Sequence, residues 1–297
     1  MNTPEPIRRA SEIEEVTNLY LIHPLSQRLV PIFARFGIRP NAVSLLGLAC
    51  GVGAGVAYHS YHALPACVIG FLLMVGWHIM DGADGQLARL LNAQSEFGKI
   101  IDGICDYVTF ISVYVGFGLA LAPQYGASVW LLIIGAGICH ALQAAAYEVK
   151  RQEYNFWGLD RRSAELPELA ALQAQSLPSG LPQRLMTLLY RAYVAMQYRV
   201  SGVTIEFRQS LKARLERPSA AAEEVRRHYR EAFAPSVRRW AVLSSNYRTI
   251  GLFVFAISGY PLGYFIFEII GFNLILLFLA LNQQRDYARF ASTMPAQ

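Results

Sequence analysis

Four aspartates within residues 81–106 have the residue type and spacing that could bind metal ions. Asp81 and Asp84 are three residues apart and Asp102 and Asp106 are four apart, so each pair would share one face of a helix. Two antiparallel helices joined by a short link would bring the pairs together. Four carboxylates so placed repel one another and are difficult to desolvate, and a bound cation offsets both penalties. Hard oxygen ligands indicate Mg²⁺, Mn²⁺ or Ca²⁺, and four carboxylates suffice for two ions that act at phosphorus.

The neighbouring residues favour a phosphate ligand. Gly85 and Ala88 remove bulk beside the acids, so that a ligand can approach the backbone closely. Arg89 lies one turn beyond Gly85 and can donate paired hydrogen bonds to a phosphate. Ser95 and Lys99 could add further donors. The alternative is a set of solvated acids at a helix boundary with glycines for helix packing. Four acids in register with glycine and arginine favour the metal site.

The elements that must position these residues are apolar helices. Hydrophobic residues make up 54% of the 297 residues and charged residues 16%, against about 25% in a typical soluble domain. This composition excludes a disordered chain, a coiled coil and an ordinary soluble enzyme. A helix needs about 20 apolar residues to cross the hydrocarbon core. We therefore predict an all-α polytopic membrane protein with six transmembrane helices, at about 41–61, 64–91, 98–122, 128–147, 239–258 and 263–281.

Two regions are predicted to lie outside the membrane. Residues 13–38 alternate apolar and polar positions at helical spacing, which predicts an interfacial amphipathic helix interrupted by Pro24 and Pro31. The polar stretch 150–238 is predicted to be a cytoplasmic helical insertion. The expected organisation is an N-terminal interfacial part, four spans with the acidic motif, the insertion, and two final spans with a C-terminal tail: 1–40, 41–149, 150–238 and 239–297.

The distribution of Lys and Arg predicts which side of the membrane each loop faces. The expected outer loops near 60–64, 122–127 and 258–263 contain neither residue, so both termini and the acidic cluster should face the cytoplasm. The net charge of +5 then indicates attraction to the anionic inner leaflet. No nucleic-acid partner is expected, because the basic residues are spread over loops. The four cysteines lie in apolar stretches and are interpreted as core residues.

The acidic segment resembles the signature of the CDP-alcohol phosphotransferase family, also called CDP-alcohol phosphatidyltransferases. The signature reads Asp-x2-Asp-Gly-x2-Ala-Arg-x8-Gly-x3-Asp-x3-Asp. The resemblance also covers the six-span layout, the N-terminal helix and the Arg-Pro-Asn-x2-Ser sequence at 39–44, but not the insertion. Every spacing of the signature is kept, with its eight positions at Asp81, Asp84, Gly85, Ala88, Arg89, Gly98, Asp102 and Asp106.

The resemblance implies an integral-membrane enzyme of phospholipid synthesis, a transferase of the EC 2.7.8 class. It would move the phosphatidyl group of CDP-diacylglycerol to a polar alcohol and release CMP. The implied cofactors are two divalent ions, Mg²⁺ or Mn²⁺. Asp81 and Asp102 would bridge both ions, while Asp84 would complete one site and Asp106 the other. Asp106 would also be the general base that takes the proton of the acceptor hydroxyl.

The family pattern implies further contacts and a setting. Gly85, Arg89 and Ser95 would contact the nucleotide and diphosphate, and Ser44 would lie near the nucleotide. Relatives of this kind form homodimers, which implies the same assembly here. A positive-inside chain without eukaryotic targeting signals indicates the inner membrane of a bacterium, with the active site facing the cytoplasm.

The acceptor site is the main open question. Basic residues near the inner boundary of the later spans could bind a phosphorylated acceptor such as inositol phosphate, or could simply anchor the topology. They are Lys150, Arg151, Arg238, Arg239 and Arg248. A polar stripe on the fourth span could line the acceptor cavity or join helices, and it consists of His140, Gln143 and Tyr147.

Two other functions compete with the first. Within the same class, a soluble CDP-alcohol of the choline or ethanolamine type could donate its phospho-alcohol to a lipid acceptor, and the motif does not separate the two. A cation transporter is a more distant alternative, and it predicts acids near the bilayer midplane on broken helices. Here the acids gather at one face beside Arg89, which would oppose the passage of a cation. Glu268, an acid within the last span, is left without a role.

Overall fold

The protein folds entirely into helices and turns in the parts of the chain that the structure describes. The structure is a computed structural model and describes residues 10–167, 169–201, 205–215 and 220–293. No β-strand occurs within these residues, and several helices are long and apolar enough to span a membrane. These features confirm the predicted class of all-α polytopic membrane protein.

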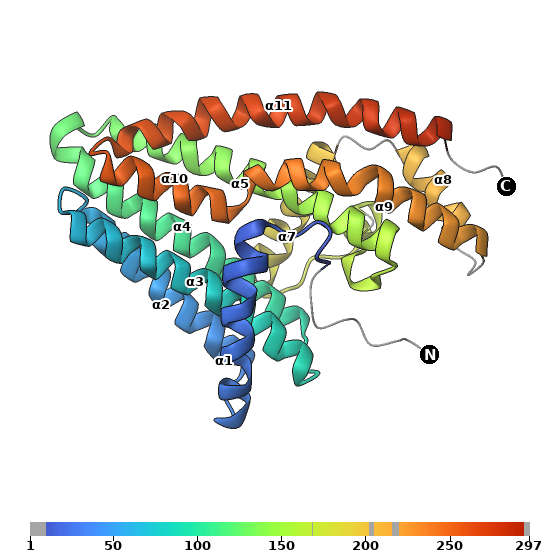
Figure 1. Cartoon of the computed structure of the whole chain (residues 1–297), viewed down its shortest axis with the longest axis horizontal. Helices are drawn as coiled ribbons and strands as arrows, with labels where there is room; N and C mark the ends of the chain where they lie inside the picture. Colours follow the sequence, from blue (N-terminus) through green and yellow to red (C-terminus); the bar gives the residue numbers. More distant parts are fainter. Residues whose placement is uncertain (1–9, 168, 202–204, 216–219, 294–297) are drawn as a thin grey trace. The chain divides into compact units, whose positions relative to one another are not determined.

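Five helical segments of the described chain are candidate membrane spans. Each agrees with a predicted apolar segment to within a few residues at its start, although several continue further (Figure 1). They correspond to α2, α3, most of α4, α5 with the π-helical turn that follows it, and α11. Their bounds are Pro40–His59, Leu64–Leu90, Ile100–Tyr125, Val129–Gly158 and Pro261–Thr293.

Local sequence signals explain where these helices begin and end. Pro40 is the first residue of α2, where its missing N–H is no loss, and Arg39 before it is extended. Ser95 caps α4 (Glu96–Tyr125) by accepting a hydrogen bond from the Gly98 amide at 3.0 Å. Gly126, with φ +73°, ends that helix in a conformation that favours glycine. Helix α5 follows as Val129–Glu153.

The N-terminal segment forms a short π-helical turn and a helix. The turn spans Asn18–Ile22 and continues into α1, His23–Arg35, with Pro31 inside it. Helix α1 packs against α3, and Ser26 Oγ donates to the carbonyl of Ile79 at 2.8 Å. The predicted helix is therefore present, but α1 continues through Pro31, where an interruption was predicted. Its position at the membrane interface stays a prediction.

The predicted fifth span, 239–258, is divided in the structure. Helix α9 ends at Trp240, a 3₁₀ turn covers Ala241–Leu243, and α10 begins at Ser245 and ends at Ile257. Ser244 between them is extended, with ψ 166°, which interrupts the helix. Because α10 has 13 residues, it is shorter than the ~20 residues that cross a hydrocarbon core. The sixth crossing therefore stays a prediction.

The polar stretch 150–238 is mostly helical, as predicted. Its last helix continues two residues past this stretch, to Trp240. After α5 the chain forms the π-helical turn Tyr154–Gly158 and the 3₁₀ turn Arg162–Ala164. Four helices follow, α6 to α9, at Leu169–Ala174, Leu181–Ser201, Ile205–Leu215 and Ala220–Trp240.

The chain forms two compact units, which are described separately. Unit 1 comprises 1–140 and 245–271, and unit 2 comprises 141–244 and 272–297. The first contains α1 to α4, α10 and the first parts of α5 and α11, and the second contains the polar insertion with the last parts of α5 and α11. The predicted domain boundaries at 40, 149 and 238 stay predictions.

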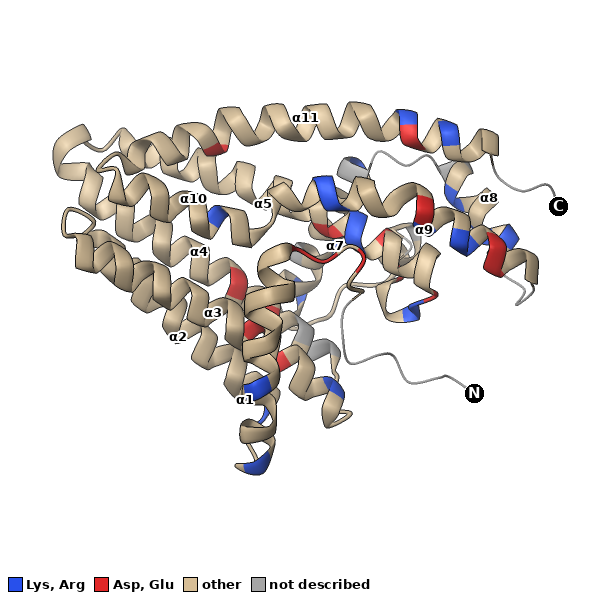
Figure 2. Ribbon diagram, viewed as in Figure 1, with Lys and Arg blue, Asp and Glu red and all other residues tan. Residues whose placement is uncertain are grey.

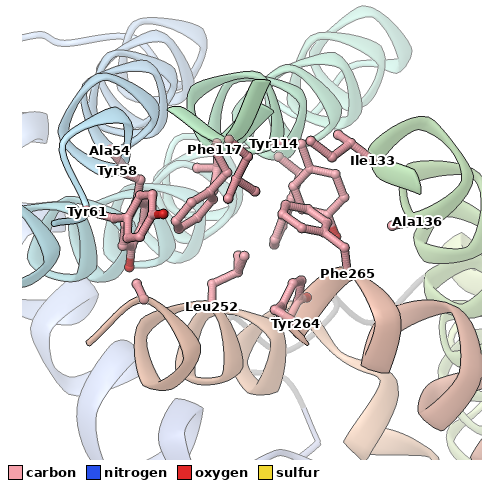
Figure 3. Packing of buried hydrophobic residues seen from close by; sticks show 14 of the residues in the cluster. Ala54, Tyr58, Tyr61, Tyr114, Phe117, Ile133, Ala136, Leu252, Tyr264 and Phe265 are labelled. Atoms are coloured by element: carbon pink, nitrogen blue, oxygen red, sulfur yellow. The ribbon is translucent and has the colours of Figure 1, made fainter. Parts of the chain in front are cut away.

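Helix α2 is the centre of the packing that supports the acidic motif, because it contacts both α3 and α4. Its glycines allow this: a Cβ on Gly51 would overlap the Thr109 side chain, and one on Gly55 would overlap the Ser112 carbonyl. Aromatic side chains fill the space beside it (Figure 3). Tyr58 stacks on Phe117 with ring centroids 4.8 Å apart. The motif-bearing helices are therefore held on a closely packed support.

Candidate metal centre

The helices that carry the aspartates are consecutive and joined by residues 91–95 only. Asp81 lies nine residues before the end of α3, while Asp102 and Asp106 lie six and ten residues after α4 begins. At about 1.5 Å per residue, all three are roughly 9–15 Å from the link. Figure 2 shows the helices as mainly uncharged along their length, with acidic residues gathered toward this end of α3 and α4. The helical register therefore places the three acids at a similar distance from the link along both helices.

Three of the four aspartates converge. Asp81, Asp102 and Asp106 each offer a carboxylate oxygen, these oxygens lie within 4.8 Å of one another, and all three residues are half-buried. Oxygen ligands on opposite sides of Mg²⁺ or Ca²⁺ are about 4.2–4.8 Å apart, from metal–oxygen distances of about 2.1–2.4 Å. The group could therefore surround a divalent ion, and its all-oxygen chemistry suits a hard cation. It is the only group of three potential ligands found among the described residues.

Asp84 has a different environment from the other three. It is 5% exposed and accepts a hydrogen bond of 2.5 Å from Ser44 Oγ, while Ser44 is itself buried on α2. The contact ties the α3 carboxylate to the first turns of α2. Asp84 does not belong to the converging group of three, so its role as a metal ligand stays a prediction. Ser44, predicted to lie near the nucleotide, directly contacts the acidic motif.

Gly85 and Arg89 lie on the same face of α3 as Asp81, because the three residues are spaced by four. A Cβ on Gly85 would lie 3.5 Å from Arg89 Nη1, so the guanidinium extends back over the glycine. The face of α3 that carries Asp81 thus presents the Arg89 guanidinium above backbone that Gly85 leaves open. This is the arrangement expected of a phosphate contact.

Ser95 has a structural role at its predicted position. Its Oγ accepts the Gly98 amide and caps α4, the helix that carries Asp102 and Asp106. Ser95 is exposed, so the hydroxyl can also donate outward. The side chain of Lys99 lies outside the part of the structure that is described.

Two acceptor-site candidates lie in unit 1. Arg248 on α10 is fully buried and pairs with Glu268, also fully buried, on α11 at 3.1 Å (Nε to Oε1). His140 is 8% exposed, and its Nδ1 lies 3.0 Å from the Tyr114 hydroxyl. Glu268, which the sequence left without a role, therefore compensates the charge of Arg248.

The other three acceptor-site candidates lie in unit 2 and contact neighbours there. Gln143 donates to Asn273 Oδ1 at 2.9 Å. Lys150 and Arg151 each pair with a glutamate on their own helix segment, with N···O distances of 3.2 Å to Glu153 and 2.7 Å to Glu148. Their predicted role at the acceptor stays a prediction.

Sequence reasoning missed a polar connection behind the motif. His78, one turn before Asp81, has its Nε2 2.9 Å from Thr249 Oγ1 on α10. Asn246, on the same helix, donates to Glu15 and Asn18 of the N-terminal segment at 2.6 and 2.8 Å. The signal that could have indicated α10 as a contact helix was its run of polar residues, 244–249, at the start of an apolar segment.

Comparison with known proteins identifies a family. A family model described as CDP-alcohol phosphatidyltransferase matches residues 38–196, which is more than half of the chain. The matched region contains α2 to α5 and every residue of the 81–106 motif. The match begins two residues before α2.

Curated relatives cover the same part of the chain. A phosphatidylinositol phosphate synthase of Mycobacterium marinum is 29% identical over 166 residues, 55% of this chain and 64% of the relative. A CDP-diacylglycerol–serine O-phosphatidyltransferase of Mycobacterium tuberculosis is 26% identical over 117 residues, 39% of each chain. The inner membrane protein YnjF of Escherichia coli is 31% identical over 145 residues, 45% of this chain and 65% of the relative. The alignments span less than two thirds of each relative's length.

Proposed function

Because the chain belongs to the CDP-alcohol phosphatidyltransferase family, we propose that it transfers the phosphatidyl group of CDP-diacylglycerol to a polar alcohol and releases CMP. The observation that carries this proposal is the convergence of Asp81, Asp102 and Asp106 within the family region. The motif lies on two of the candidate membrane spans, which suits a lipid-linked donor. The proposed chemistry is phosphatidyl transfer in phospholipid synthesis.

The aspartates would hold the cofactor. Asp81 and Asp102 would bridge two divalent ions, Mg²⁺ or Mn²⁺, with Asp84 and Asp106 completing one site each. Bound ions would supply positive charge to the diphosphate and to the charge that develops as CMP leaves. The hydrogen bond from Ser44 would orient the Asp84 carboxylate by occupying one of its oxygens.

The nucleotide and diphosphate would lie along the face of α3 that Asp81, Gly85 and Arg89 share. Gly85 leaves the backbone open, and the Arg89 guanidinium above it would donate to phosphate oxygens. Ser95 would add a hydroxyl donor at the start of α4, and Ser44 on α2 would lie near the nucleotide while its hydroxyl donates to Asp84. Holding the donor this way supplies positioning, which is most of what transfer at phosphorus requires.

Asp106 would act as general base. Its carboxylate would take the proton of the acceptor hydroxyl while that oxygen forms a bond to the phosphorus of the phosphatidyl group. The bond from this phosphorus to the CMP oxygen breaks, and CMP leaves. Asp106 suits the role because it belongs to the converging group, so an acceptor near the phosphorus would be within reach.

The acceptor is proposed to be a polar alcohol. The relatives include a CDP-diacylglycerol–serine O-phosphatidyltransferase and a phosphatidylinositol phosphate synthase, which supports a small hydrophilic acceptor. Candidate side chains are His140 and Arg248 in unit 1, and Gln143, Lys150 and Arg151 in unit 2. We further propose a homodimer in the inner membrane of a bacterium, with the active site on the cytoplasmic side.

A direct assay tests the proposal. Purified protein is incubated with labelled CDP-diacylglycerol and, separately, with serine, inositol, inositol phosphate, glycerol phosphate or choline, and both CMP and lipid product are measured. We expect one alcohol to support product formation, EDTA to stop it, and Mg²⁺ or Mn²⁺ to restore it. A parallel arm supplies CDP-choline or CDP-ethanolamine with diacylglycerol. Product in that arm alone would show that the donor is a soluble CDP-alcohol and the acceptor is a lipid. The absence of CMP in every arm would refute the proposal.

A further inference from the structure

The turn of α3 that carries Asp81 is contacted by two helices from outside the acidic motif. Helices α1 and α10 both pack against α3 (Figure 1). Side chains of these two helices reach α3 at His78, Ile79 and Gly82, all within three residues of Asp81. The proposed chemistry uses none of these contacts, so they need an explanation of their own.

Helix α1 contacts this turn through Ser26. Ser26 is fully buried, and its Oγ lies 2.8 Å from the carbonyl of Ile79 and 2.9 Å from that of Ile22. A Cβ on Gly82 would lie only 2.7 Å from the same Oγ. A side chain at position 82 would therefore displace the hydroxyl from the Ile79 carbonyl. Gly82, the neighbour of Asp81 in the chain, thus admits the close approach of α1.

Helix α10 contacts the same turn through Thr249. Its Oγ1 lies 2.9 Å from Nε2 of His78, and both side chains are buried. A buried polar atom that loses its partner is costly, so this contact resists any separation of α10 from the turn. Asn246, one turn earlier in α10, donates to Glu15 of the N-terminal segment at 2.6 Å. The segment that leads into α1 is therefore tied to α10, and both are tied to α3.

Asp81 needs such support more than the other two acids of the converging group do. Asp102 and Asp106 lie on one helix, and the helix itself fixes their spacing. The distance from Asp81 to that pair depends instead on how α3 packs. The carboxylate oxygens lie within 4.8 Å and repel one another, which favours movement of the Asp81 turn away from α4. A binding site functions only when its residues are held to within about 0.5 Å.

We propose that Ser26 and Thr249 are positioning residues, which hold the turn that carries Asp81 close to the other two aspartates. The inference rests on the metal centre of the proposed function, and on no step of the transfer reaction. Neither side chain is proposed to touch the ion. Breaking either contact should therefore weaken ion binding through Asp81 alone.

Binding of Mn²⁺ in the absence of substrate tests Thr249. The full chain in detergent is titrated with Mn²⁺, and the unbound ion is measured by electron paramagnetic resonance. Thr249→Val keeps the shape of the side chain but removes the hydroxyl. Direct partners of metal ligands contribute about 10- to 100-fold to affinity, and Thr249 acts one step further away, so the dissociation constant should rise at least about threefold. Thr249→Ser keeps the hydroxyl and should bind as the unchanged chain does. Equal affinity of Thr249→Val and the unchanged chain would overturn the role of Thr249.

A control separates positioning from a general loss of stability. Tyr264→Phe removes a buried hydrogen bond to Glu268 in the same unit. The Tyr264 ring packs on Tyr114, which lies eight residues, roughly 12 Å, beyond Asp106 on α4. This variant should lower the free energy of unfolding and leave the Mn²⁺ affinity unchanged. A fall in affinity as large as that of Thr249→Val would overturn the inference.

A compensating pair of variants tests the contact of α1. Gly82→Ala crowds the Ser26 hydroxyl, and Ser26→Ala leaves a gap, so each should raise the Mn²⁺ dissociation constant at least about threefold. In the double variant the new methyl group replaces the lost oxygen, and it would lie 3.5 Å from the Cβ at position 26, an ordinary contact. The double variant should therefore bind Mn²⁺ more tightly than either single variant. Independent effects of the two changes, or no effect of either, would overturn the role of Ser26.

Asp81→Asn distinguishes failure of this inference from failure of the metal centre. If the unchanged chain binds Mn²⁺ no more tightly than Asp81→Asn, the metal centre is refuted and the inference with it. If the unchanged chain binds tightly and the Ser26 and Thr249 variants bind equally well, only the inference is refuted.

Discussion

Asp81, Asp102 and Asp106 each place a carboxylate oxygen within 4.8 Å of the other two. Like charges this close repel one another strongly. Partial burial strengthens the repulsion, because less water is present to screen it. The helix register that creates the repulsion is also the one the family motif requires. A divalent ion held as proposed would offset this repulsion, so the spacing of the three residues would favour its binding.

Asp106→Asn tests the division of roles among these acids. The amide keeps an oxygen that could still contact a metal but cannot accept the proton of the alcohol, so CMP release should fall by at least about 10²-fold. Binding of CDP-diacylglycerol should remain measurable by equilibrium binding. Asp286→Asn on α11 is a control outside the cluster and should retain activity. Full activity of Asp106→Asn would exclude this residue as the base.

Helices α10 and α11 are joined by a buried charge pair whose contribution to stability can be measured. Arg248 and Glu268 are both fully buried, and Glu268 also accepts hydrogen bonds from Tyr264 and Tyr114. Removing one partner leaves a buried charge uncompensated. Arg248→Met or Glu268→Gln should therefore each lower the free energy of unfolding by about 3–5 kcal/mol.

The double variant shows whether the loss of unfolding free energy comes from breaking the ion pair. Arg248→Met combined with Glu268→Gln should lose clearly less than the sum of the single variants, because no charge is left unpaired. Unfolding in detergent, followed by helical content, provides the measurement. As a control, the exposed pair of Arg227 and Glu224 should contribute little. Strictly additive losses of unfolding free energy at positions 248 and 268 would contradict the conclusion that the two residues stabilise the protein as a pair.

Helix α4 must approach α2 closely to bring its aspartates to the cluster. A Cβ on Gly116 would overlap the backbone carbonyl of Gly55, whereas a Cβ on Gly103 of the same helix has nothing within 4 Å. Gly116→Ala should lower the free energy of unfolding by about 1–3 kcal/mol, since backbone cannot move aside easily. Gly103→Ala should not destabilise the protein, because alanine favours helix. Equal stability of both variants, measured by denaturant unfolding, would show that the close contact is unimportant.

These elements also show what sequence alone could predict. The spans from α2 to α5 begin and end at apolar runs bounded by proline, serine and glycine, which are local signals. The spacing of Asp81, Asp102 and Asp106 is also local, so the cluster was predictable once the helices were. The pairing of Arg248 with Glu268 was not, because it depends on how α10 and α11 pack. The interruption at Ser244 was missed because the apolar residues 240–243 and 250–257 were interpreted as one span across the polar run 244–249.

At the scale of the whole molecule, the number of crossings decides where the insertion and the C-terminus lie. Five candidate spans are found among the described residues, and α10, with 13 residues, falls short of a full crossing. The loops at 60–63, 126–128 and 258–260 contain no Lys or Arg, whereas the insertion and the end of α11 contain many. The positive-inside rule therefore favours six crossings, with α10 and the turns before it completing the fifth.

Cysteine labelling separates the two topologies. Ser60→Cys, Ser210→Cys and Ser258→Cys introduce exposed thiols after α2, on α8 and before α11, and a membrane-impermeant maleimide is applied to intact cells. With six crossings, positions 60 and 258 should react from outside and position 210 only after lysis. If α10 does not cross, position 258 should react together with 210, which would place the C-terminal arginines outside against the charge rule. The unmodified protein is the control, because its four native cysteines are free thiols and its residual labelling must be subtracted.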